Sequence, residues 1–174
     1  MKLGSYTEEQ LALVRSRLAT TGRAQMDLFL APEAAESLYQ AARAENYNVV
    51  SRRAAGHMDM GQAWLDMLSP QQKQGLAEVI QNSATHDFQY LYDNYPVFDA
   101  VQDGTAGPVW KALYDFLNGA DFLDRMREVT GEPRIAMADC QLTRFRRGHF
   151  LTEHDDNLAE KKRYYAYVLN LTPQ

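Results

Sequence analysis

Cysteine is nearly missing from this sequence, because Cys140 is the single one in 174 residues. One cysteine cannot form a disulfide within the chain, which favours a reducing compartment, and we expect a cytoplasmic protein. Long hydrophobic runs are missing as well. No apolar stretch reaches the roughly 18 residues of a membrane span, and residues 1–6 do not open a signal peptide. We therefore expect a soluble protein with no membrane partner.

Positive charge is in deficit. The sequence carries 18 lysines and arginines against 23 aspartates and glutamates, which gives a formal net charge of −5. Nucleic-acid backbones are neutralised by clustered basic side chains, so this balance argues against a nucleic-acid-binding protein. Apolar residues make up 45% of the chain and charged residues 24%. Such a composition is ordinary for one globular domain and excludes a disordered tail or a low-complexity array.

Helical patterns dominate the first part of the sequence and strand patterns the last part. Apolar spacing, capping residues and terminal glycines predict helices over residues 7–22, 32–42, 69–80, 108–117 and 122–131. β-Branched and aromatic residues predict strands over 26–30, 47–53, 87–95, 135–145 and 164–171, with a loop at 99–107. This order predicts a single α+β domain over 1–174, helix-rich in 1–133 and strand-rich in 134–174. Trp64 and Trp110 lie in helical patterns and are expected in the core.

The most informative chemistry is a His-x-Asp pair formed by His154 and Asp156. In an extended strand, residues two apart project from the same face, so an imidazole and a carboxylate can meet at one point. One neutral nitrogen and one anionic oxygen suit a divalent iron, and a third ligand would complete a two-His-one-carboxylate triad. The alternative is a polar, solvated turn over 153–157, and Asp155 is expected to point away from the pair.

The sequence around this pair resembles the iron- and 2-oxoglutarate-dependent dioxygenases, in particular their prolyl-4-hydroxylase-like branch. The segment Phe29-Leu-Ala-Pro32 resembles the start of the branch's catalytic region, and Thr130-Gly131 also matches the branch. The other resembling segments are Phe116-Leu-Asn-Gly-Ala-Asp-Phe-Leu123, Gln141-Leu-Thr-Arg-Phe-Arg-Arg-Gly-His-Phe-Leu-Thr-Glu-His-Asp-Asp156 and Arg163-Tyr-Tyr-Ala-Tyr-Val-Leu-Asn-Leu-Thr-Pro173.

This resemblance implies a double-stranded β-helix (a jelly-roll) packed against helices. It implies that His154 and Asp156 are the first two ligands of Fe(II). The implied reaction consumes O2 and 2-oxoglutarate, releases succinate and carbon dioxide, and hydroxylates an unactivated C–H bond. The substrate implied is a prolyl or similar residue of a protein or peptide, and ascorbate keeps the iron ferrous.

The resemblance is incomplete at the C-terminal end. The family's second histidine ligand and its basic anchor for 2-oxoglutarate follow later, but no histidine follows Asp156, and the later cations of residues 161–163 come too early. His149 is an odd number of residues from His154, so a continuous strand would place it on the other face. His57 and His86 stay open as replacement ligands.

Two interpretations of the whole chain follow from these departures. We expect the front part of a longer enzyme that stops inside its jelly-roll, with an apolar strand at 164–171 whose exposed edge invites self-association. The alternative is a non-catalytic binding or assembly module, or an inactive fragment without the third ligand.

Other candidates have ordinary explanations. Arg144, Arg146, Arg147 and His149 form a basic cluster that is either an attractor for an anionic substrate or a solvated loop. Aromatic residues of 87–95 are interpreted as sheet packing rather than as a ligand platform. Cys140 is interpreted as a small buried hydrophobe rather than a nucleophile.

Two positions depart from the family's co-substrate pocket. Phe145 and Asn170 stand where relatives often carry tyrosines near 2-oxoglutarate. We therefore assign no residues to co-substrate binding.

Overall fold

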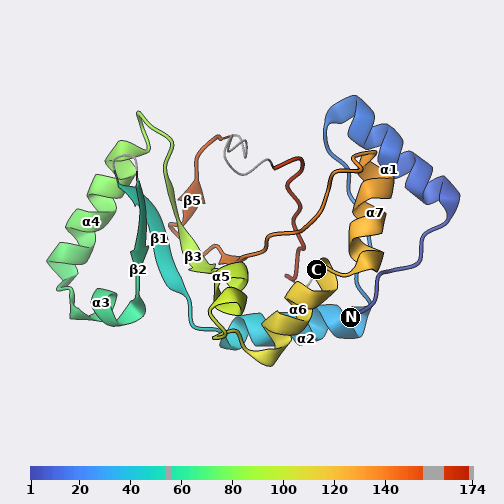
Figure 1. Ribbon diagram of the computed structural model, residues 1–174. Coiled ribbons are helices and arrows are strands. Elements are labelled where there is room, and N and C mark those ends of the chain that lie inside the picture. Colours follow the sequence, from blue (N-terminus) through green and yellow to red (C-terminus); the bar gives the residue numbers. More distant parts are fainter. Residues whose placement is uncertain (54–55, 155–162, 173–174) are drawn as a thin grey trace. The chain divides into compact units, whose positions relative to one another are not determined.

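The computed structural model describes residues 1–53, 56–154 and 163–172. Within these ranges the chain is an α+β structure with seven helices and one antiparallel sheet of five strands (Figure 1). The helices are α1 (Glu8–Thr21), α2 (Pro32–Ala44), α3 (Gln62–Met67), α4 (Pro70–Ser83), α5 (Val97–Gln102), α6 (Pro108–Leu117) and α7 (Ala120–Thr130). The strands are β1 (Asn48–Arg53), β2 (Gly56–Met60), β3 (Tyr90–Tyr95), β4 (Leu142–Arg144) and β5 (Phe150–Leu151).

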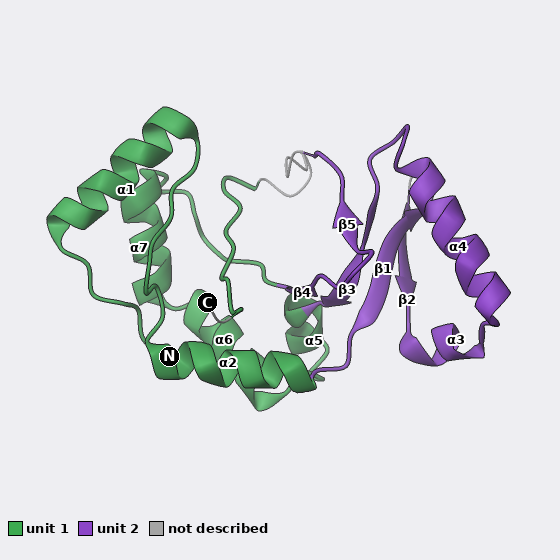
Figure 2. Ribbon diagram, turned by 180° about the vertical axis from the view of Figure 1, so that it is seen from behind, with its two compact units in different colours: residues 1–44, 97–140, 162–174 green, residues 45–96, 141–161 purple. Residues whose placement is uncertain are grey.

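The chain divides into two compact units (Figure 2). Unit 1 contains the described residues of 1–44, 97–140 and 162–174, and unit 2 those of 45–96 and 141–161. Each unit is therefore built from segments far apart in the sequence. The single domain over 1–174, with its change of character near residue 133, stays a prediction.

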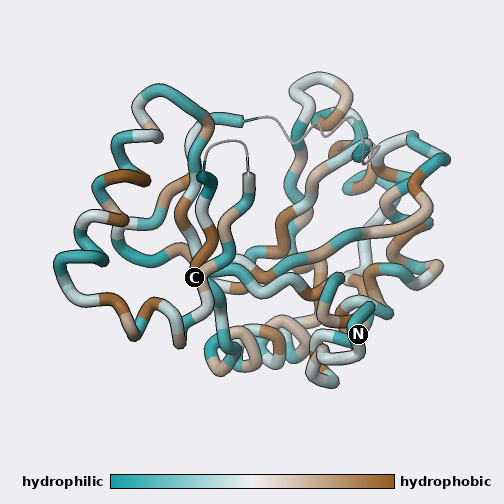
Figure 3. The backbone as a smooth tube through the Cα atoms, turned by 60° about the vertical axis from the view of Figure 1, so that its left-hand side comes forward, coloured by the Kyte–Doolittle hydropathy of each residue, from teal (hydrophilic) through white to brown (hydrophobic). Residues whose placement is uncertain are grey.

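Unit 1 is helical, and its helices begin and end where local chemistry dictates. The Thr7 hydroxyl accepts the backbone N–H of Gln10 while the Gln10 side chain accepts that of Thr7, which is a complete capping box for α1. Gly22 ends α1 in a left-handed conformation with φ of 71°, which a glycine adopts at little cost. Hydrophobic and hydrophilic positions alternate along the helical stretches (Figure 3). We conclude that the predicted helix over 7–22 is confirmed.

The apolar interior of unit 1 surrounds Phe122, a residue of α7 whose side chain is 1% exposed. Its ring lies edge-on to Phe29 at 5.8 Å and to Phe116 at 5.9 Å, and Tyr167 approaches at 5.7 Å. Such edge-to-face pairs add to the free energy of burying the rings. A second cluster joins α1 to α7 through Leu11, Val14 and Val129.

Unit 2 holds the sheet, in the order β2-β1-β3, with β4 and β5 both paired to the other edge of β3. Asp93 lies opposite Arg144 in β4, and Tyr90 lies opposite Leu151 in β5. The two short strands follow the same edge and are separated by residues 145–149. Gly148 in this interruption has φ of 88°, and the His149 N–H donates to the Arg146 carbonyl at 2.9 Å. Helix α4 contacts β1.

The predicted strand over 135–145 is wrong except at β4. Its first part belongs to unit 1, where helix side chains and backbone occupy its hydrogen-bonding groups. Asn118 donates to the Ala138 carbonyl at 3.0 Å and accepts its N–H at 2.9 Å. Arg127 donates to the Ile135 carbonyl, and the Phe98 N–H donates to the Cys140 carbonyl. A segment pinned in this way cannot pair as a strand.

The predicted strand over 164–171 is also wrong, because its described residues have no strand partner. Two of its tyrosine hydroxyls form hydrogen bonds within unit 1. Tyr165 donates to the Thr130 carbonyl at 3.4 Å and Tyr167 to the Asp139 carbonyl at 2.8 Å. The segment is not covered on both sides, since Val168 is 88% exposed. Self-association through a strand edge here stays a prediction.

Three smaller expectations fail. The strand expected over 26–30 is only a bridge between Leu3 and Leu30, because Leu28 takes a left-handed φ of 52° that a strand cannot contain. The loop expected over 99–107 begins with α5, whose Val97 is buried. Trp110 is buried as predicted, but Trp64 lies on the short helix α3 and is 42% exposed. No described helix combines the length and the apolar character that crossing a membrane requires.

Candidate functional site

His154 follows β5, and its position depends on the edge of β3. Beyond Leu151 the chain stays in register with the sheet, because the Thr152 N–H donates to the Gln89 carbonyl at 3.0 Å. The Nδ1 atom of His154 lies 3.0 Å from the Thr152 carbonyl oxygen. A carbonyl oxygen can only accept, so Nδ1 is the protonated nitrogen in this contact. In the neutral ring the lone pair is then on Nε2, the arrangement in which a histidine binds a metal through Nε2.

The plane of the His154 ring is fixed by a neighbouring aromatic side chain. Its centroid lies 5.5 Å from that of Phe88, with 30° between the planes. The Arg52 guanidinium lies over the Phe88 ring at 5.5 Å and also donates to the Phe88 carbonyl at 3.0 Å. The ring against His154 is thus itself held from two directions.

A row of aromatic side chains continues from Phe88 along β3. Alternate residues of a strand share a face, and the rings of Phe88, Tyr90 and Tyr92 follow one another at 5.6 and 5.5 Å. Phe145 extends the row beyond Tyr92 at 5.3 Å. The rings pack against one another, while Phe88 and Phe145 are also partly open to solvent. We call Phe88, Tyr90, Tyr92 and Phe145 the aromatic row.

His57 reaches the same row from β2. Its Nδ1 lies 2.7 Å from the Tyr90 hydroxyl, and the two rings are stacked with centroids 6.0 Å apart. Burial, with a smaller contribution from Tyr92, raises the pKa of Tyr90, against the lowering effect of Arg52. The phenol therefore keeps its proton, and its O–H can donate a hydrogen bond to Nδ1 of His57. The structure thus brings His57 and His154 to adjacent rings of one row.

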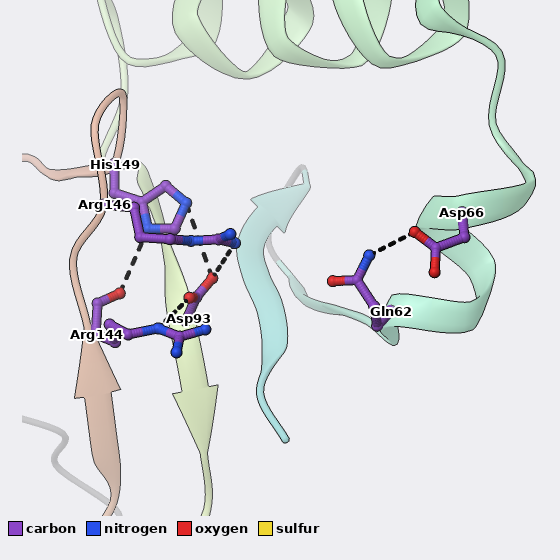
Figure 4. Close-up of polar contacts among 6 residues, drawn as sticks. All are labelled: Gln62, Asp66, Asp93, Arg144, Arg146 and His149. Atoms are coloured by element: carbon purple, nitrogen blue, oxygen red, sulfur yellow. Dashed lines mark hydrogen bonds and ion pairs between the residues drawn. The ribbon is translucent and has the colours of Figure 1, made fainter. Parts of the chain in front are cut away.

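The basic cluster of residues 144–149 is organised around a buried carboxylate (Figure 4). The Asp93 side chain is only 1% exposed, and its oxygens accept from Arg144 at 2.8 Å and from Arg146 at 2.7 Å. His149 lies with Nε2 3.9 Å from Asp93 Oδ1 and Nδ1 3.4 Å from the Arg144 carbonyl. Three members of the predicted cluster therefore converge on β3, and His149 is directed to Asp93.

Sequence reasoning missed two buried polar residues of unit 2, Asp93 in β3 and Gln89 immediately before that strand. A signal for Asp93 was present, because a lone carboxylate inside an aromatic strand pattern needs basic partners. The sequence offers such partners in the arginines of 144–147, which precede the His-x-Asp pair. Gln89 carried no such signal, since a glutamine next to an aromatic strand is ordinary.

The other predicted residues are Asp155, Asp156, His86 and Cys140. Asp155 and Asp156 lie outside the described residues. His86 is exposed in the turn after α4. Burial, with a smaller contribution from Asp139, raises the pKa of Cys140 to about 12, so its thiol stays protonated and is a poor nucleophile.

The metal implied by the resemblance can be tested against these side chains. An imidazole nitrogen is a suitable donor for ferrous iron, and the hydrogen bond at Nδ1 prepares Nε2 of His154 for this role. Across residues 1–53, 56–154 and 163–172, no three histidine, cysteine or acidic side chains gather as a metal site. Of the two ligands that the resemblance implies, His154 lies within the described residues.

Comparison with known proteins adds no assignment, since no family model, curated protein or solved structure matches the chain.

Proposed function

We propose that this chain is an iron(II)- and 2-oxoglutarate-dependent dioxygenase that hydroxylates a prolyl or similar residue of a protein or peptide. The observation that carries the proposal is the state of His154, the first residue of the His-x-Asp pair. Its Nδ1–H is engaged by the Thr152 carbonyl, so Nε2 is the nitrogen that can bind a metal. In this proposal the sheet belongs to a jelly-roll core.

Each part of the site has a separate task. His154 and Asp156 hold the ferrous iron, and a third ligand comes from His57, His86 or residues outside the described ranges. When bound, iron with 2-oxoglutarate and O2 supplies the chemistry that turns C–H into C–OH and releases succinate and carbon dioxide. Phe88 and the Thr152 carbonyl orient the imidazole.

The test is succinate release from 2-oxoglutarate with Fe(II), ascorbate and a prolyl peptide present. We expect His154→Ala and Asp156→Asn each to abolish release. Asp59→Asn is the matched control, because Asp59 is an exposed carboxylate of β2 in the same unit. Undiminished release from either ligand variant contradicts the assignment of the site.

Metal binding separates the enzyme from the alternative of a non-catalytic module. We expect Mn²⁺, a probe suited to a site with a carboxylate, to lose its sharp solution EPR signal in the presence of the chain. His154→Ala restores that signal if His154 is a ligand. Full signal with the unmodified chain supports the binding or assembly module instead.

A further inference from the structure

Thr152 is bound to Gln89 by three hydrogen bonds. Its N–H donates to the Gln89 carbonyl at 3.0 Å, and its Oγ1 accepts the Gln89 N–H at 2.9 Å. The same hydroxyl donates to the Gln89 carbonyl at 3.1 Å. These contacts hold the backbone of Thr152 in one position against the edge of the sheet, two residues before His154.

The side-chain amide of Gln89 is hydrogen-bonded through both its oxygen and its nitrogen, and the residue is 3% exposed. Its Oε1 accepts from the N–H groups of Arg52 at 2.9 Å and Tyr90 at 2.8 Å, and from the Ser51 hydroxyl at 3.3 Å. Its Nε2 donates to the Arg52 carbonyl at 2.8 Å and to the Ser83 hydroxyl at 2.6 Å. One buried amide thus joins β1, the end of α4 and the start of β3, and a satisfied buried network of this kind is rigid.

Two described contacts of His154 originate in this network. The hydrogen bond at Nδ1 comes from the Thr152 carbonyl. The ring contact comes from Phe88, whose carbonyl and ring are engaged by Arg52. Arg52 in turn exchanges two hydrogen bonds with the Gln89 amide. The imidazole therefore receives both its tautomer and its ring plane from residues tied to Gln89.

We propose that Thr152 and Gln89 are positioning residues for His154, which hold its ring in the Nδ1–H tautomer so that Nε2 is the ligating nitrogen. The metal role of Nε2 rests on the proposed function. The tautomer itself is a property of the chain without metal and can be measured separately.

The experiment is long-range ¹H–¹⁵N NMR of the metal-free full chain, at a pH where the His154 ring is neutral. We expect Nδ1 to carry the proton in the unmodified chain. Thr152→Val keeps the shape of the side chain and the N–H bond to Gln89 but removes both hydroxyl bonds. It should therefore yield a mixture of tautomers, whereas Thr152→Ser keeps the hydroxyl and should restore Nδ1–H.

Thr143→Val is the matched control, because Thr143 is an exposed threonine of β4 on the same edge of β3. It should leave the His154 signals unchanged. Mn²⁺ affinity, followed by EPR, should fall about 10-fold in Thr152→Val, the lower end of the effect of losing a residue that orients a metal ligand.

Two results overturn the inference. One is an Nε2–H tautomer in the unmodified chain, a readout that needs no variant to fold. The other is the same tautomer in Thr152→Val as in the unmodified chain. If the tautomer responds as expected but no variant or parent chain binds Mn²⁺, the positioning of His154 stands and the proposed dioxygenase fails.

Discussion

Burying a carboxylate inside a sheet costs free energy unless cationic side chains pair with it. Asp93 is a buried carboxylate that is paired in this way. Arg144 of β4 and Arg146 of the following loop donate to its two oxygens, and both guanidiniums keep contact with water, at 41% and 52% exposure. The desolvation cost therefore falls mainly on the acid. Arg144 also lies over the Tyr47 ring at 4.0 Å, so the same side chain adds a cation–π contact.

Asp93→Asn should destabilise the protein by about 2 kcal/mol, the loss expected for hydrogen bonds to a charged group. A larger loss is not expected, because the half-exposed arginines can turn to water. Urea denaturation followed by circular dichroism gives the free energy of unfolding. Asp59→Asn, on the exposed side of β2, is the control and should stay within about 0.5 kcal/mol of the parent. Equal stability of Asp93→Asn and the parent would show that the ion pairs contribute nothing.

At the scale of single elements, the sequence predicts what depends on neighbours along the chain. The helix over 7–22 is predicted because Thr7, Gln10 and Gly22 act within a few residues of one another. The same local rules place α4 after Ser69 and end α7 at Gly131. Strands need partners from elsewhere, and here prediction was less accurate.

The strand over 135–145 shows the physical reason. Its apolar and branched residues favour an extended chain, but Asn118 holds the backbone of Ala138 to the end of α6. Neither the identity of Asn118 nor its spacing from residue 138 indicates this contact. Tertiary hydrogen bonds therefore override a strand pattern that is only a local preference.

The α1 cap permits a test of local stabilisation. Thr7→Ala removes the hydroxyl that accepts the Gln10 N–H and should lower the free energy of unfolding by about 1 kcal/mol. Thermal or urea unfolding measures the difference. Thr20→Ala, near the other end of α1, is the matched control because its hydroxyl bonds only to carbonyls of the preceding turn. A loss of the same size in both variants would argue against a specific capping contribution.

At the scale of the whole molecule, the candidate site could be predicted only in part. The His-x-Asp pair is visible in the sequence, and the structure adds the contacts of its histidine. Gln89 and Phe88 lie more than sixty residues earlier, and nothing in the residues themselves connects them to Thr152 or His154. Pairing of β5 with β3 creates that connection, and strand pairing is the property that local patterns specify least.

Both units should lose stability in alkali, for a common reason. Burial raises the pKa of Tyr47 in unit 2 to about 12, that of Cys140 in unit 1 to about 12, and that of Tyr167 well above its ordinary value. The unfolded chain releases these protons near pH 9 for the thiol and pH 10 for the phenols, while the folded chain retains them. Since the unfolded state then binds fewer protons, the free energy of unfolding falls as pH rises from about 9 to 12.

Urea titrations at pH 8, 10 and 11 measure this slope. Tyr47→Phe removes one of the ionising groups and should make the decline shallower than in the parent. Tyr164→Phe, at an exposed side chain, should leave the decline as it is. A free energy of unfolding that stays constant up to pH 11 would contradict the predicted effect.

The interruption between β4 and β5 has a consequence for how this protein tolerates change. Because β5 and Thr152 take their register from β3 and Gln89, the placement of His154 does not depend on how many residues lie between the two strands. Residues inserted after Gly148 should bulge outward and leave the histidine where it is. The loop is thus a place where length can vary in evolution, or a peptide tag be introduced, without moving the candidate ligand.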